Sequence, residues 1–297
     1  MFNEIIGNEK IKKQLRKALK ENKVSHSYMF IGIEGIGKQI IAKDFAQMIL
    51  CMNEEKKGCN QCKSCIEFQS HNHPDFLYIE PDGNSIKIEQ IRYIQRKIQE
   101  KPIISDKKVY IINDADKMTT EAQNCLLKTL EEPPEYSIII LIGNNENGFL
   151  NTIRSRCMII TFQPIDNVLI QKYIKEEYGI DNISANLLEA FEGSIGKAIL
   201  LKDKKEQYEK IEKLIEELDK KNIIDILKLS EEIYEDKNEI VNILEYMNII
   251  LIKLAKENIK YINCIHIVEE TKKRLNQNAN YDMSIDNMIF NMWEEIN

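Results

Sequence analysis

Residues 26–38 read HSYMFIGIEGIGK, and this stretch decides the fold. Its first half, which ends at Gly32, contains an apolar run with the length of a buried strand, and its second half is rich in glycine. A strand that passes through a glycine-rich turn into a helix is the setting of a phosphate-binding loop, where backbone N–H groups and a lysine bind the anion. The candidate loop residues are Gly32, Gly35, Gly37 and Lys38.

Strand-like and helix-like patterns alternate on both sides of this stretch. Such alternation predicts an α/β domain over residues 1–163, with a parallel five-stranded sheet and helices on both of its faces. The expected strands are Tyr28–Gly32, Phe76–Ile79, Val109–Ile112, Ile138–Ile142 and Met158–Phe162. The expected helices are residues 8–22, 38–52, 86–100 and 119–131.

No strand pattern follows Pro164. Residues 164–204 have the pattern of a small helical unit, which contains the turn Gly193-Ser194-Ile195-Gly196, and residues 205–297 have the pattern of a second helical unit. In the latter, residues 240–257 are apolar on most sides, which favours a helix buried in a bundle or an oligomer. We therefore expect three domains.

Composition and charge exclude several classes of protein. The 297 residues include 41 lysines and arginines and 48 acidic residues, for a net charge of -7. This sign opposes a protein that grips DNA through its whole surface. No apolar run of roughly 18 residues occurs and the N-terminus has no hydrophobic signal segment, so we expect a cytoplasmic protein with no membrane partner.

Two positions hold residues that differ from those of a working ATPase. The loop lysine is followed by Gln39, where a serine or threonine hydroxyl would hold magnesium. The apolar strand ending at Ile112 continues as Asn113-Asp114, so an amide stands where the metal-organising acid belongs. These two changes argue against efficient hydrolysis and leave nucleotide binding open. The alternative is a working ATPase with unusual residues at both positions.

Four of the seven cysteines lie within fifteen residues, in the pattern C-x7-C-x2-C-x2-C. Tetrahedral zinc requires four converging thiolates, and two short C-x2-C steps let one turn supply three of them. A fully occupied set of four leaves no position for water, so the zinc would be structural. The alternatives are a redox pair or chance clustering, and His71 and His73 are interpreted as loop residues. The expected ligands are Cys51, Cys59, Cys62 and Cys65.

Residues 152–157 read TIRSRC and precede the last expected strand. An arginine at a domain edge can enter the ATP site of a neighbouring subunit and stabilise the charge that develops on the γ-phosphate. Taken alone, the tripeptide Ser155-Arg156-Cys157 carries almost no information about function, and a surface salt bridge is the simpler interpretation.

Other motifs accompany this tripeptide in a fixed order: IGNEKIKKQL, HSYMFIGIEGIGK, the four-cysteine insert, SIKIEQIR and KKVYIINDADKMTTEAQNCLLKTLEEPP. Together they resemble the delta-prime family of clamp-loader subunits of bacterial DNA polymerase III, which are AAA+ proteins. The resemblance covers residues 1–163 strongly and the segment GSIGKAIL moderately. It implies a RecA-like domain with a zinc insert near residues 51–65, an all-α lid and an all-α C-terminal collar.

The resemblance also implies partners and roles. The chain would join gamma/tau motor subunits and a delta subunit in a hetero-pentamer, and would meet the sliding clamp and primer-template DNA through that complex. ATP and Mg²⁺ would be bound by the partner subunits. Arg156 would act in trans at a motor's ATP site, with Ser155 fixing its loop, and the glycines and Lys38 would form a vestigial phosphate loop.

Two other functions remain open at this point. A gamma/tau-type motor ATPase with degenerate motifs shares several of the motifs, but it would be expected to keep Lys-Ser or Lys-Thr in the loop and an arginine at Gly196. A stand-alone, zinc-dependent nucleic-acid binder is disfavoured by the acidic net charge.

Overall fold

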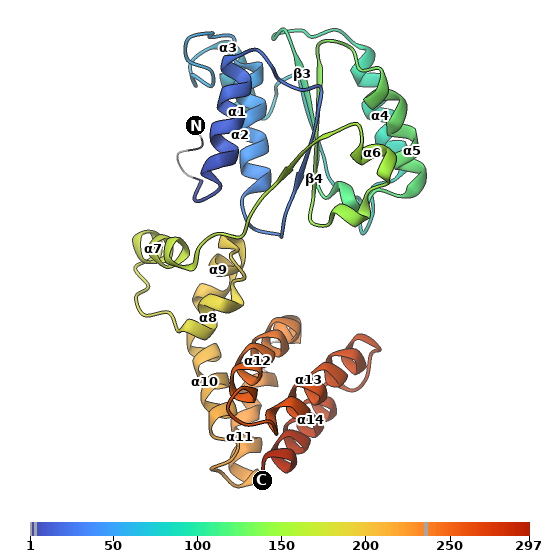
Figure 1. The fold of residues 1–297 in the computed structure, drawn as a ribbon. Coiled ribbons are helices and arrows are strands. Elements are labelled where there is room, and N and C mark those ends of the chain that lie inside the picture. Colours follow the sequence, from blue (N-terminus) through green and yellow to red (C-terminus); the bar gives the residue numbers. More distant parts are fainter. Residues whose placement is uncertain (1, 3–4, 235–236) are drawn as a thin grey trace. The chain divides into compact units, whose positions relative to one another are not determined.

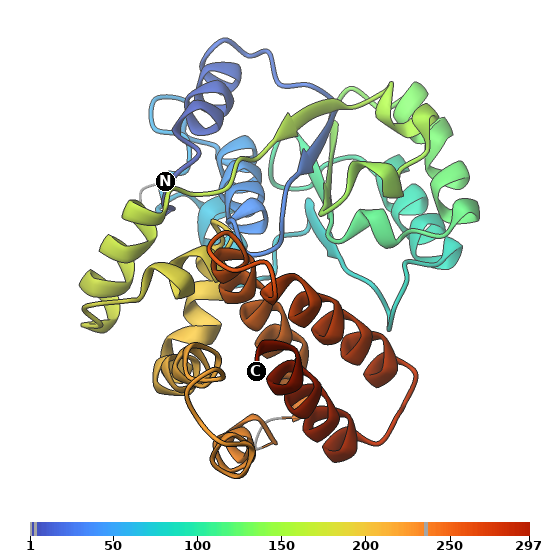
Figure 2. The same ribbon diagram turned by 60° about the horizontal axis from the view of Figure 1, so that its bottom comes forward.

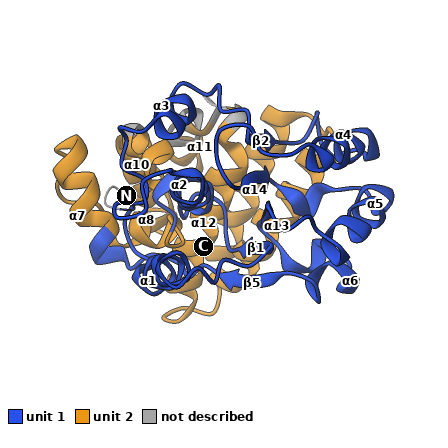
Figure 3. Ribbon diagram, turned by 90° about the horizontal axis from the view of Figure 1, so that it is seen from above, with its two compact units in different colours: residues 1–169, 194–196 blue, residues 170–193, 197–297 orange. Residues whose placement is uncertain are grey.

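The computed structural model describes residues 2, 5–234 and 237–297. It forms two compact units, coloured separately in Figure 3. The first unit comprises Met1–Leu169 with Ser194–Gly196, and the second comprises Ile170–Gly193 with Lys197–Asn297. In the described residues no helix is long and apolar enough to cross a membrane.

The first unit is built on a five-stranded parallel sheet with the strand order β2-β3-β4-β1-β5. Each strand lies within one residue of its predicted bounds, because each is a short apolar run with clear ends. The strands are β1 Ser27–Ile31, β2 Phe76–Ile79, β3 Lys108–Ile112, β4 Ser137–Gly143 and β5 Met158–Thr161.

Helices cover both faces of this sheet, as Figure 1 shows. Successive side chains of a strand point to opposite faces, so Tyr28 and Phe30 of β1 pack with one set of helices while Met29 packs with the other. One face is covered by α1 Glu9–Lys20 and α2 Lys38–Leu50, and the other by α4 Ile88–Gln99, α5 Thr120–Glu131 and α6 Asn151–Arg154. The predicted α/β architecture is therefore confirmed.

Local signals explain where these helices begin and end. The Thr119 hydroxyl accepts a hydrogen bond from the backbone N–H of Ala122 and caps α5, and Pro133 and Pro134 follow its last turn. Two helices have no counterpart in the sequence-based prediction, namely α3 Lys63–Gln69 and the four-residue α6. Short 3₁₀ turns η1 Ala115–Lys117 and η2 Glu146–Gly148 complete this unit.

The second unit is helical, without strands in its described residues. Its helices are α7 Asn167–Tyr178, α8 Ala185–Ala190, α9 Ile195–Leu201, α10 Lys205–Glu216, α11 Ile223–Tyr234, α12 Ile240–Ala255, α13 Tyr261–Asn276 and α14 Tyr281–Ile296, with 3₁₀ turns η3 Lys202–Lys204 and η4 Lys237–Glu239. The first residues of α7 and α9 belong to the first unit. The helix α12 packs on α8, α10 and α13, and Figure 2 shows α13 and α14 side by side. The finer division into a lid over 164–204 and a collar over 205–297 stays a prediction.

Candidate functional site

The glycine-rich loop lies between β1 and α2, at the carboxyl end of the sheet. Because β1 pairs with β4, this loop lies beside the residues that follow Gly143. The loop backbone has φ of +76° at Gly35, which favours glycine. A Cβ at Gly35 would lie 2.2 Å from Ser194 Oγ and 2.9 Å from Gly196 Cα, and the Gly196 N–H donates to Gly35 O at 2.9 Å. A turn 159 residues downstream is therefore seated directly on the loop.

The Lys38 ammonium is engaged by the protein itself. It donates to the carbonyl oxygens of Gly32 and Ile33, both at 2.6 Å, and to Asn144 Oδ1 at 2.8 Å. An ammonium has three N–H donors, so these contacts use all of them. Lys38 is only 6% exposed, and burial lowers its pKa from 10.5 to about 8, partly opposed by nearby Asp116.

Asn144 is held in place by Asp116, which sequence reasoning missed. Asp116 Oδ2 accepts from the backbone N–H groups of Asn144 at 3.1 Å and Asn145 at 3.2 Å. Its other oxygen, Oδ1, is buried without a hydrogen-bond partner among the described residues. A second acid, Asp114, has φ of 47° and pairs with Lys117 at 3.0 Å.

The Gln39 side chain is also hydrogen-bonded within the domain. Its amide donates to the Tyr78 hydroxyl of β2, and Lys43 Nζ lies 4.6 Å from the centre of the Tyr78 ring. Asn113 follows β3, where its backbone N–H donates to Ile79 O at 2.8 Å. Neither Gln39 nor Asn113 supplies the carboxylate or hydroxyl oxygens that magnesium prefers.

The four predicted zinc ligands converge. Cys51 caps the C-terminal end of α2 and Cys65 lies in α3, and the four Sγ atoms lie within 4.8 Å of one another. The Sγ–Sγ distances are 3.7 Å for Cys51–Cys59, 3.9 Å for Cys51–Cys62 and 4.0 Å for Cys59–Cys65, and all four cysteines are free. Four thiolates at about 2.3 Å from one ion would be about 3.8 Å apart, so the residues present fit tetrahedral zinc.

Backbone geometry favours the charged form of one ligand. The N–H groups of Gln61 and Cys62 point at Cys59 Sγ, at 3.5 and 3.3 Å, and these contacts lower the pKa of Cys59 to about 6. Metal binding requires thiolates, so this arrangement suits a metal ligand.

His71 and His73 lie outside the cysteine cluster, in the loop that follows α3, as predicted. His71 is exposed, whereas His73 is buried with its Nε2 2.9 Å from Ser64 Oγ and its Nδ1 accepting from the Asp75 N–H. Burial lowers the pKa of His73, so the neutral ring is favoured. The Ser64 and Ser105 hydroxyls both donate to Leu50 O at 2.7 Å, which fixes the end of α2 beside the cysteines.

Arg156 lies in the turn between α6 and the edge strand β5. Its backbone oxygen accepts from the buried Ser27 hydroxyl at 2.6 Å. Its Nη1 donates to Thr152 O at 2.8 Å and to Ser155 Oγ at 3.2 Å, and its Nη2 forms an ion pair with Glu131 Oε1 at 2.7 Å. The Arg156 side chain nevertheless stays 33% exposed.

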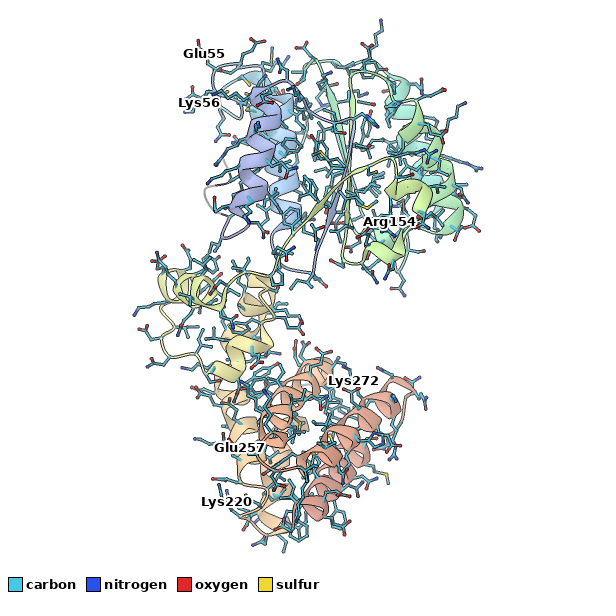
Figure 4. All side chains as sticks on the ribbon, viewed as in Figure 1. Glu55, Lys56, Arg154, Lys220, Glu257 and Lys272 are labelled. Carbon is cyan, nitrogen blue, oxygen red and sulfur yellow. The ribbon has the colours of Figure 1, made fainter. Side chains whose placement is uncertain are left out.

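The neighbouring Arg154 has the same exposed fraction as Arg156, 33%, but a different ion-pair partner. Arg154, labelled in Figure 4, pairs with Glu146, and its Nε is buried without a partner among the described residues. Cys157 packs against the core cluster that contains Ile153 and Leu130, and burial raises the pKa of its thiol to about 11. On β5, the apolar side chain of Met158 is 42% exposed.

Comparison with known proteins gives three kinds of similarity. Residues 7–166 match the family described as DNA polymerase III, delta subunit. The chain is 35% identical over 192 residues to the DNA polymerase III subunit delta' of Bacillus subtilis, covering 65% of this chain and 58% of that protein. It is 36% identical over 170 residues to the Bacillus subtilis subunit tau, covering 57% of this chain and 30% of that protein.

The fold is similar to that of a solved structure of a DNA polymerase III gamma subunit-related protein from Thermotoga maritima. The TM-score is 0.50 at 19% identity, covering 96% of this chain and 100% of that chain. The chain thus spans less than two thirds of the two Bacillus subtilis relatives, and its identity to them does not separate the delta' type from the tau type.

Proposed function

This chain belongs to the DNA polymerase III delta-subunit family that its residues 7–166 match, and we propose that it is the delta-prime, non-motor subunit of an AAA+ clamp loader. In this role it supplies Arg156 to the ATP site of a neighbouring motor subunit. It does not hydrolyse ATP itself, and it supports ATP-driven loading of a sliding clamp onto primed DNA.

One observation carries the proposal: the Arg156 side chain at the domain edge stays one third exposed, while Lys38 is buried in contacts with its own loop. A phosphate approaching Lys38 would have to replace three hydrogen bonds. It would also meet the turn that rests on Gly35. Hydrolysis would further lack a magnesium hydroxyl at Gln39, whose amide already bonds Tyr78. The loop is therefore proposed to be vestigial.

The surroundings of Arg156 support a role across an interface. The backbone of this turn is anchored by Ser27, so the guanidinium projects from a fixed base. Beside it, β5 is an edge strand with the partly exposed apolar side chains of Met158 and Ile159. A partner that packs on this edge would bury them and exclude water around the arginine, where its charge acts most strongly. Ser155 Oγ accepts from the guanidinium and is proposed to fix the loop.

Zinc is proposed as the structural metal of residues 51–65. Bound by Cys51, Cys59, Cys62 and Cys65, it would cross-link the end of α2 to the start of α3 and would take no part in chemistry. The proposed partners are gamma/tau motor subunits, which bind ATP and Mg²⁺, and a delta subunit, together in a hetero-pentamer.

A second candidate is a gamma/tau-type motor ATPase, which the 36% identity to a tau subunit favours. The two functions differ in what the purified chain does alone. A motor hydrolyses ATP without other subunits, whereas the proposed subunit shows no turnover above background.

The proposal is tested with the complex reconstituted from this chain, motor subunits and a delta subunit. Arg156→Ala should assemble normally but reduce hydrolysis at the one motor site that it serves, on the order of 10³-fold. Single-turnover ATPase with primed DNA measures this rate. The control is Arg274→Ala, which removes an exposed arginine paired with Glu270 on α13. Unchanged turnover in Arg156→Ala would refute the assignment.

A further inference from the structure

Glu131 contacts Arg156 from a different element. It is the last residue of α5, whereas Arg156 follows α6, 25 residues later in the chain. The Arg156 Nη2 lies 2.7 Å from Glu131 Oε1, a distance typical of a charge-assisted contact. The pair is accessible, with the Glu131 side chain 48% exposed.

The two helices that carry this pair are fixed to one another. Gln123 in α5 is buried, its Nε2 donates to Gly148 O at 2.9 Å, and its Oε1 accepts from the Leu150 N–H at 2.8 Å. These bonds hold the segment that leads into α6, and Ile153 of α6 packs into the same core cluster as Leu130. Figure 1 and Figure 3 show α5 and α6 adjacent. The Glu131 carboxylate is therefore presented from a rigid neighbour.

The position of Glu131 is unfavourable for the helix itself. It occupies the last turn of α5, where the partial negative charge of the helix C-terminus disfavours an acid. Arg156 is the cation that pairs with this acid across the gap between the two helices. Glu131 is therefore unfavourable for the stability of α5, and the ion pair with Arg156 is the interaction that accounts for an acid at this position.

The other contacts of the guanidinium are local. Thr152 O and Ser155 Oγ belong to the same short segment as Arg156 and bind only Nη1. They would move with the loop, whereas Glu131 ties Nη2 to the domain core. One N–H of Nη2 and the Nε–H have no partner among the described residues, so a phosphate oxygen could be bound while the ion pair persists.

We infer that Glu131 is a positioning residue for Arg156: its carboxylate holds the guanidinium in the direction from which a motor subunit's triphosphate is reached. This inference rests on the proposed function of Arg156. Exposed ion pairs are worth about 0.2–1 kcal/mol, so its loss should lower the rate by about 1.4- to fivefold.

The test uses the reconstituted complex with primed DNA and four variants of this chain: Glu131→Gln, Arg156→Ala, the double variant and the control Glu132→Gln. Glu132 is the exposed neighbour of Glu131, and no ion pair to it occurs in the described residues. Glu131→Gln should lower the single-turnover rate of ATP hydrolysis at the motor site that Arg156 serves by about 1.4- to fivefold, with an unchanged KM for ATP. It should have no further effect in the Arg156→Ala background, and Glu132→Gln should leave kcat unchanged.

The outcomes separate the inference from the function on which it rests. A loss in Arg156→Ala without a loss in Glu131→Gln overturns the inference alone, as does an equal loss in the Arg156→Ala background. A faster Glu131→Gln enzyme also overturns it, since the carboxylate would then restrain the arginine. No loss in Arg156→Ala overturns the proposed function. Thermal unfolding of each free chain checks that Glu131→Gln keeps the fold.

Discussion

Two cations of the first unit, Lys38 and Arg156, are held in opposite ways. Lys38 is 6% exposed and gives all three donors to its own loop and Asn144, whereas the Arg156 side chain is 33% exposed and has two N–H groups without a partner among the described residues. The same sheet positions both, since β1 leads into the loop and the Ser27 hydroxyl at its start binds the Arg156 backbone. This difference in burial agrees with the roles proposed for the two residues, a vestigial phosphate loop and an arginine supplied to a neighbour.

The largest effect on stability is expected from removal of the proposed zinc. The metal would fix the end of α2 at Cys51, and the same helix begins at Lys38 in the phosphate loop. Cys62→Ser should lower the zinc content from about one ion per chain to none and destabilise the chain by several kcal/mol. Metal analysis and hydrogen exchange measure this, with Cys125→Ser, outside the cluster, as the control. Faster exchange should reach α2 and spare the Arg156 turn. A folded, metal-free wild type would contradict the zinc assignment.

The next largest effect, on the rate of ATP hydrolysis, distinguishes Arg156 from the nearby Arg154. Arg156→Lys keeps the charge but loses the planar fork of donors, so hydrolysis at the served motor site should fall by about 10²-fold. Arg154→Lys is the matched control, because Arg154 has the same exposed fraction as Arg156 and also pairs with a glutamate of its own domain, Glu146. Single-turnover ATPase of the complex compares them. A greater loss in Arg154→Lys would transfer the proposed role to that residue.

The closed state of Lys38 should be visible in the pH dependence of stability. Its folded pKa of about 8 lies below the unfolded value near 10.5, so between these values the unfolded chain binds more protons. The free energy of unfolding therefore gains up to about 3 kcal/mol from this group as the pH rises through that window. Urea unfolding of Lys38→Met at pH 7.5 and 10.5 should lack this gain. Parallel pH curves for both proteins would show that Lys38 is not desolvated.

The smallest effect concerns the turn that rests on the loop. Gly35→Ala and Gly83→Ala introduce a Cβ at similar φ values of +76° and +70°, but only the first meets atoms within 4 Å, including Ser194 Oγ at 2.2 Å. Gly35→Ala should cost about 1–2 kcal/mol more than Gly83→Ala, because overpacking adds to the backbone strain. Urea unfolding of both variants measures the difference. Equal losses in the free energy of unfolding would mean that the turn at Ser194–Gly196 shifts to accommodate the added Cβ at little cost.

Much of the fold was predictable because each strand is an apolar run with clear ends, as in Ser137–Gly143. The cysteine cluster was predictable because its ligands are close in sequence. The helix α3 was missed because ligand and polar residues interrupt any apolar period, and α6 because four residues are too few to show one. The resemblance to the delta-prime family is confirmed by the family match and the relatives.

The site contacts were not predictable, because they join residues far apart in the chain. Glu131 is 25 residues from Arg156, and Gly196 is 161 residues from Gly35. Asn144 follows β4 and reaches Lys38 only because β4 and β1 are neighbours in the sheet. Residue type and spacing indicate which side chains can act, whereas strand order decides which of them meet.

The strand β1 has one further consequence. Its five residues separate the Ser27 anchor of the arginine from the first glycine of the loop by roughly 15 Å. The arginine and the phosphate loop therefore lie at opposite ends of β1, which we call the donor end (Arg156) and the receiver end (the phosphate loop). Domains of this kind that stack head to tail repeat a single donor-to-receiver junction, as in a heterologous ring. If the proposed function is correct, a copy whose phosphate loop is closed by its own Lys38 contacts would interrupt that repeat once and so define where the ring begins.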